Sequence, residues 1–168
     1  MTRIDVIDAL LGPESAAAVA ELRGQKPELA TQMQDYYDAV FEPALDSAEA
    51  LAPSERWLIA VRTAAHTQSD TVVDWYAEQA RQSGVADVDI ARARDVTTAW
   101  NDNPRSSAIV KHVDLIVTHP VDSGRADIEA LADAGLTPAG IVALSQVVAY
   151  VSYQLRLVAA LRALGEPQ

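Results

Sequence analysis

Residues 134–155 read AGLTPAGIVALSQVVAYVSYQL, a run of 22 residues without a charged side chain. This length is enough to span a bilayer, but Thr137, Pro138 and Gly140 form a helix-start signal where lipid requires continuous apolar side chains. Apolar residues continue to Leu161 and cover almost the whole circumference of one long helix, which is typical of a helix buried on most sides. The sequence therefore predicts a central core helix, covered by the rest of the chain or partly by a second subunit.

The composition of the chain also indicates a helical protein. Of 168 residues (18.0 kDa), 49% are apolar, only 5% are aromatic, and 31 are alanine, the residue with the highest helix propensity. A chain of this length forms one domain whose core needs no disulfide or metal. We therefore expect a single all-α domain over residues 1–168.

The charge balance is strongly acidic. Lys and Arg total 13 against 24 Asp and Glu, which gives a net charge of −11 and a pI near 4.5. Nucleic acids and anionic membranes are bound through basic surfaces, so we expect no nucleic acid and no membrane as a partner. The chain has no cysteine, which rules out disulfides, thiolate metal sites and cysteine nucleophiles.

Helix-start and helix-stop residues divide the chain into segments. They predict helices at residues 4–11, 14–23, 27–41, 53–66 and 70–84, a loop or short turn at 44–52, a helix from Asn101–Pro104 to His119–Pro120, and a last helix from Thr137–Pro138 to Leu164–Gly165. Two helix-ending joints have similar sequences 51 residues apart, at Gly84-Val85 and Gly135-Leu136. At each joint we expect a left-handed glycine, with the next apolar residue packing back on the helix that ends there.

The start of the chain carries no targeting signal, since Asp5 and Asp8 stand where an apolar segment would lie, and we expect a cytoplasmic protein. The long apolar helix in an acidic, alanine-rich chain favours a homo-oligomer. No phosphate-binding or other cofactor motif is present, so no cofactor is expected. His112 and His119 lie seven residues apart without an accompanying ligand pattern, so no metal site is expected either.

One polar stripe follows the helix that begins at Pro53. Its members are Glu55, Arg62, His66 and Ser69, which fall within an arc of roughly 60°. A carboxylate, a guanidinium, an imidazole and a hydroxyl in line could form a proton relay or an anion-binding wall. The alternative is a solvated face, or Glu and Arg side chains that pair with neighbouring helices.

The last helix carries polar residues on two of its faces. Ser145, Ser152 and Arg156 share one face, and Gln146, Tyr150 and Tyr153 share another. Buried polar groups need partners, so we expect core or interface contacts here, with a ligand pocket as the alternative.

Residues 54–95 resemble a known family. The segments ERWLIAVRTAAHTQSDTVVDWY (55–76) and ARQSGV (80–85) are similar to the carboxymuconolactone decarboxylase domain of the AhpD-like alkylhydroperoxidase superfamily. In that pattern a Glu-Arg-x-Leu start leads to a Cys-x-x-Cys-x-x-x-His stretch, and a helix closes in Ala-Gly-Leu. The segments 119–138 and 150–156 are similar to the repeat that ends such domains. The resemblance implies a bundle of two helical hairpin halves with its core at about 52–164, an N-terminal extension at 1–43, and homo-oligomerisation.

Departures from the family pattern limit the function. The two family cysteines fall on Ser69 and Val72, the family histidine falls on Tyr76, and of the relay group only the upstream acid, Glu55, is retained. Thiol-dependent peroxide reduction needs one thiolate to attack and a second thiol to resolve the intermediate, so the chain is not a thiol peroxidase.

Three functions stay open, in this order. In the first, the chain binds a small molecule in the former active-site region. In the second, it is an acid–base enzyme, such as a lactone decarboxylase-type lyase or isomerase, that acts on a small carbonyl substrate. In the third, it is a structural subunit of an oligomer. The candidate catalytic residues are Glu55, His66 and Tyr76. The candidate substrate-binding residues are Arg62, Ser69, Trp75 and Arg156. If Glu55, Arg62, His66 and Tyr76 form a working site, we expect their polar groups to converge near the turn at Ser69.

Overall fold

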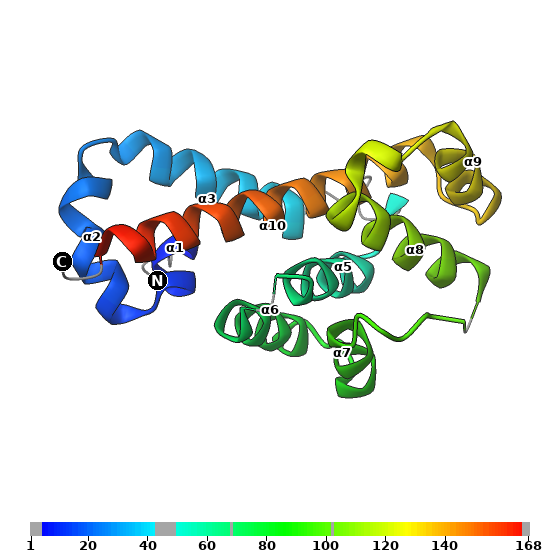
Figure 1. Cartoon of the computed structure of the whole chain (residues 1–168), viewed down its shortest axis with the longest axis horizontal. Helices are drawn as coiled ribbons and strands as arrows, with labels where there is room; N and C mark the ends of the chain where they lie inside the picture. The colour runs from blue at the N-terminus through cyan, green and yellow to red at the C-terminus, as the bar shows by residue number, and fades with distance from the viewer. Residues whose placement is uncertain (1–4, 43–49, 68, 102, 166–168) are drawn as a thin grey trace.

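The computed structural model describes residues 5–42, 50–67, 69–101 and 103–165. The protein is 81% helical, and every regular element in these ranges is a helix, which confirms the predicted all-α class. The elements are α1 (Val6–Leu11), α2 (Pro13–Gly24), α3 (Pro27–Phe41), α5 (Pro53–Ala65), α6 (Asp70–Gln82), α7 (Asp87–Arg94), α8 (Pro104–Thr118), the 3₁₀ turn η1 (Pro120–Asp122), α9 (Arg125–Asp133) and α10 (Pro138–Gly165) (Figure 1). Ile4 and most of the predicted loop at 44–52 lie outside the described residues.

Proline sets most of the helix starts that the sequence predicts. Its fixed φ suits the first turn of a helix, where an N–H group has no partner within the helix. The helices that begin on proline start at Pro13, Pro27, Pro53, Pro104 and Pro138. Before α8, Asn103 adds a side-chain cap by accepting from the Ser106 N–H at 2.8 Å.

Helix α10 is the longest element and lies along the length of the molecule. Helices α1–α3 pack around its C-terminal half, and α5, α8 and α9 pack along the rest (Figure 1). By length and composition α10 could cross a membrane, and half of its most apolar stretch is buried within the fold. The expected burial on most sides is therefore met only in part, since Val142, Tyr153 and Leu164 are 57%, 48% and 66% exposed.

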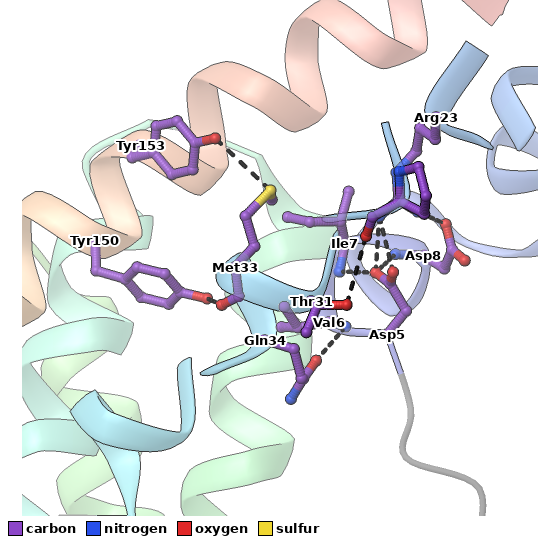
Figure 2. Close-up of polar contacts among 11 residues, drawn as sticks. Asp5, Val6, Ile7, Asp8, Arg23, Thr31, Met33, Gln34, Tyr150 and Tyr153 are labelled. Carbon is purple, nitrogen blue, oxygen red and sulfur yellow. Dashed lines mark hydrogen bonds and ion pairs between the residues drawn. The ribbon is translucent and has the colours of Figure 1, made fainter. Parts of the chain in front are cut away.

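One arginine ties the N-terminal helices together. Arg23 in the last turn of α2 donates to both Asp5 and Asp8 (Figure 2), with 2.8 and 3.0 Å to the two Asp5 oxygens. Asp5 also caps α1 by accepting from two N–H groups of its first turn. From α3, Gln34 Oε1 accepts from the Val6 N–H at 2.9 Å. These contacts fix α1 between α2 and α3.

The two similar helix-ending joints have the same backbone geometry. Gly84 and Gly135 have φ values of 86° and 89°, a region that L side chains rarely adopt. The following residues, Val85 and Leu136, are buried, and each donates its N–H to the carbonyl five residues back at 3.0 Å. The expected left-handed glycine and the packing back of the next apolar residue are both confirmed.

A line of buried hydrogen bonds joins α6, α10 and α3. The Tyr76 hydroxyl donates to Gln154 Oε1, and Gln154 Nε2 donates to the Tyr150 hydroxyl at 3.0 Å. The Tyr150 hydroxyl in turn donates to the Met33 carbonyl at 2.9 Å (Figure 2). Burial raises the pKa of Tyr76 well above its ordinary value, and the nearby phenols of Tyr150 and Tyr37 raise it further. Burial also raises the pKa of Tyr37 and of Tyr150.

We predict that the protein loses stability in alkali because of these three tyrosines. Their pKa values are raised in the folded state, so above pH 10 the unfolded chain releases protons that the folded state retains. The free energy of unfolding therefore falls as the pH rises above 10, by up to about 1.4 kcal/mol per pH unit for each tyrosine. Urea unfolding at a series of pH values measures this slope.

The comparison is between Tyr76→Phe and Tyr153→Phe. The first removes a fully buried phenol and makes the alkaline fall less steep, whereas Tyr153 is 48% exposed and its replacement changes the slope less. The same slope in the unmodified chain and in both variants would contradict the assignment of the alkaline fall to buried tyrosines.

Candidate functional site

The polar stripe of α5 faces α8 and is paired there. Glu55 and Arg105 pair near the N-terminal ends of the two helices, with N–O distances of 2.7 and 3.0 Å. Arg62 and Asp114 pair near the C-terminal ends through two contacts of 2.7 Å. The two helices therefore run in the same direction. The structure therefore contains the alternative arrangement, in which the Glu and Arg side chains of the stripe pair with a neighbouring helix.

Asp114 accepts from two side chains of α5. Its Oδ1 accepts from Arg62 Nε and lies 2.8 Å from His66 Nε2, and its Oδ2 accepts from Arg62 Nη2. Burial alone would raise the pKa of Asp114, but the hydrogen bonds from Arg62 and His66 outweigh burial and hold this pKa below its ordinary value. An ionised carboxylate only accepts, so His66 Nε2 carries the hydrogen and the neutral ring has its lone pair on Nδ1.

Arg62 acts as an internal clamp. Its side chain is 2% exposed, and besides Asp114 it donates to the carbonyls of Asp95 at 2.5 Å and Val96 at 3.1 Å. It thereby holds the chain that follows α7 against α5. The Asp95 carboxylate closes its own turn by accepting from Thr97 and Thr98, and these hydrogen bonds lower the pKa of Asp95 to about 2.

A pocket of about 510 Å³ opens beside His66. It lies where the end of α5, the start of α6 and the end of α8 meet one face of α10. Polar side chains on its wall include Ser69, Thr118, Ser152, Arg156 and Arg162, and its apolar side includes Val72, Val117, Leu155 and Val158. Among the residues that the structure describes, no Asp or Glu lines this pocket, although acidic residues outnumber basic ones in the chain.

The structure brings together only part of the predicted site. His66, Ser69 and Arg156 line the same pocket. Glu55 lies eleven residues before His66 on α5, a separation of about 16 Å along the helix axis. Its Oε2 accepts from the Ala52 N–H at 2.9 Å, and both of its oxygens contact Arg105. Glu55 therefore holds the start of α5 to α8 and does not reach the turn at Ser69.

The aromatic candidates point into the core. Tyr76 is fully buried with its hydroxyl on Gln154, and Trp75 packs against Tyr37 and Tyr76 at ring-centroid distances of 6.0 and 5.0 Å. Arg62 lies behind His66, where Asp114 and two backbone carbonyls engage it. The expected convergence of Glu55 and Tyr76 with His66 on the turn at Ser69 does not occur.

Sequence reasoning missed Asp114 and Arg162. Asp114 lies 48 residues from His66, so no local spacing connects the two. The sequence feature that could have identified Asp114 is its position as a lone carboxylate in the apolar run of α8, between Val113 and Leu115. Arg162 reaches the pocket because its helix is long, and its Nη2 donates to the Leu10 carbonyl at 2.8 Å.

The other two histidines, His112 and His119, lie outside this pocket. Among the residues that the structure describes, no group of three or more His, Asp or Glu side chains could hold a metal ion. His112 is 5% exposed within α8, where burial lowers its pKa, and His119 is exposed just after that helix.

Comparison with protein families matches more than half of the chain. Residues 27–114, which are 88 of the 168 residues, match the model of the carboxymuconolactone decarboxylase family. The matched range begins at α3 and ends at Asp114, so it includes every member of the His66–Asp114–Arg62 group. No curated protein and no solved structure matches the chain.

We predict that Asp114→Asn destabilises the protein by about 2–3 kcal/mol near neutral pH, because the buried Arg62 loses its ionic partner. The pKa of Asp114 is lowered on folding, so its stabilisation is present above the ordinary value of 3.8 and is lost as the pH falls through the lower folded value. The stability difference between the two proteins therefore shrinks below about pH 4. Urea unfolding at several pH values measures it.

Asp87→Asn is the control, because Asp87 is 76% exposed and pairs with the exposed Arg81. It changes the free energy of unfolding by less than about 1 kcal/mol. Equal effects of the two substitutions would contradict the structural role of Asp114.

Proposed function

The chain belongs to the carboxymuconolactone decarboxylase family, and we propose that it binds a small organic anion in the pocket beside His66. The family's thiol chemistry has no nucleophile here, because the chain contains no cysteine. The observation that carries the proposal is the charge of the pocket wall. In a chain of net charge −11, the described residues of this wall include two arginines and a histidine but no carboxylate.

The two pocket arginines differ from most others in the chain. Ion pairs with Asp or Glu engage Arg23, Arg62, Arg81, Arg92, Arg94, Arg105 and Arg125. Arg156 instead donates to the Ser152 carbonyl at 3.0 Å, and Arg162 donates to the Leu10 carbonyl. Among the described residues neither has a carboxylate partner, so both keep N–H groups for a ligand oxyanion.

The rest of the pocket favours a ligand with an apolar body. Valine and leucine side chains from α6, α8 and α10 form one side, and the volume of about 510 Å³ lies within the usual range for small-molecule sites, about 300–1,000 Å³. Hydroxyls of Ser69 and Ser152 lie on the same wall. A small carboxylic acid with an apolar body matches this combination of groups.

Acid–base catalysis is the second candidate, and the contact between His66 and Asp114 favours it. A carboxylate that fixes one ring nitrogen leaves the other as a base, which is how a general-base histidine is oriented. In this function Arg156 binds the anionic group of a small carbonyl or lactone substrate, and His66 moves the proton. Asp114 and Arg62 act as positioning residues, and Glu55 and Tyr76 stabilise the fold.

We also propose that the chain associates with itself. Half of the most apolar stretch of α10 is not buried within one chain, and Val142 is 57% exposed next to the exposed Gln146 and Ala149. A second copy that covers this uncharged face removes apolar surface from water without burying a charge.

We predict that benzoate binds saturably and that benzamide, its uncharged analogue of the same shape, binds at least about tenfold more weakly. Arg156→Gln lowers the affinity for benzoate by about tenfold because it removes a charged donor. Arg125→Gln is the matched control, since Arg125 is 92% exposed on α9. Isothermal titration calorimetry measures all of these affinities. Equal binding of benzoate and benzamide, or no effect of Arg156→Gln, would count against an anion site.

We predict that light scattering gives a mass of at least two chains of 18.0 kDa. Val142→Glu lowers that mass, because it places a charge on the exposed face of α10. A single-chain mass for the unmodified protein at micromolar concentration would remove this proposal.

A further inference from the structure

A second recess lies between α2, α3 and α10. It has a volume of about 290 Å³ and shares no residue with the pocket beside His66. Its α10 residues are Tyr153, Leu157 and Leu161. Those of the other pocket are Ser152, Leu155, Arg156, Val158, Ala159 and Arg162. At 100° per residue these two sets lie on opposite sides of α10. We call this recess the α3–α10 groove.

The walls of the α3–α10 groove are apolar and unusually exposed. Leu22 and Leu29 are 46% and 48% exposed, and Leu157 and Leu161 line the α10 side. Met33 adds a flexible thioether, and its sulfur receives only a long contact of 3.7 Å from the Tyr153 hydroxyl (Figure 2). Covering these side chains with an aliphatic chain removes their apolar surface from water.

One end of the groove carries the ammonium group of a lysine. Lys26 lies in the turn between α2 and α3, and its ammonium group makes no hydrogen bond or ion pair with any described residue. Arg23 lies beside it but is engaged by Asp5 and Asp8 (Figure 2). No acidic residue within the described ranges lines the groove, in a chain with 24 Asp and Glu residues. An apolar wall that ends at an available ammonium group is complementary to an anionic amphiphile.

We propose that the α3–α10 groove binds a single free aliphatic carboxylate, with its carboxylate at Lys26 and its chain between α3 and α10. The groove is a recess in one molecule rather than a flat face, and a chain of net charge −11 is repelled by an anionic bilayer, so the ligand is a dissolved molecule and not a membrane. This site does not depend on the function of the pocket beside His66.

The test is a calorimetric titration of the full-length chain with decanoate below its micelle concentration and with decanol. Leu29→Ser weakens the binding of both probes by about tenfold, because it removes an apolar wall. Lys26→Gln weakens decanoate by about three- to fivefold and leaves decanol unchanged, because only decanoate has a charge. Lys111→Gln, which replaces an exposed lysine on α8, changes neither affinity. Both groove variants concern exposed side chains, and an unchanged melting temperature shows that they fold.

Three results would overturn the proposal. Decanoate that does not bind, or that binds only as part of anionic vesicles, excludes a free carboxylate. Decanoate that is displaced by benzoate and is insensitive to Leu29→Ser and Lys26→Gln belongs to the pocket beside His66. Groove variants that reduce the mass of an oligomer without decanoate binding show that a second copy covers the groove.

Discussion

The site depends on the contacts that the Asp114 carboxylate makes. This carboxylate joins α8 to α5 through Arg62 and His66, with three contacts of 2.7–2.8 Å. The same contact fixes the hydrogen on His66 Nε2 and neutralises an arginine that is only 2% exposed. Because Arg62 also holds the backbone carbonyls of residues 95 and 96, one carboxylate positions a helix pair, a loop and the histidine on the wall of the pocket.

The helices could be predicted from the sequence because local residues set their ends. Prolines at first positions and left-handed glycines at Gly84 and Gly135 act within a few residues, so their effect can be read without the fold. The spacing of Arg62 and His66 likewise placed them on one face of α5. Their partner could not be predicted in this way, since Asp114 lies on a helix about fifty residues away and meets α5 only after the chain folds.

Packing explains why Glu55 and Tyr76 lie outside the site. Glu55 lies on the predicted face, but Arg105 and the N–H of Ala52 engage it at the far end of α5. The sequence resemblance assigned Tyr76 to the position of a family histidine, yet its phenol ring is buried beside Phe41 and Trp75, and its hydroxyl donates to Gln154. Position along the chain could not show which side chains turn inward.

Heteronuclear NMR of the three histidine rings, with His66 assigned through His66→Gln, reports which nitrogen carries the hydrogen and whether the other contacts a ligand. We predict that the neutral form of His66 carries its hydrogen on Nε2 and that Asp114→Asn removes this preference. We also predict that the Nδ1 signal shifts saturably as benzoate is added. A hydrogen on Nδ1 in the unmodified protein, or an Nδ1 signal that benzoate does not change, would contradict the proposed site beside His66.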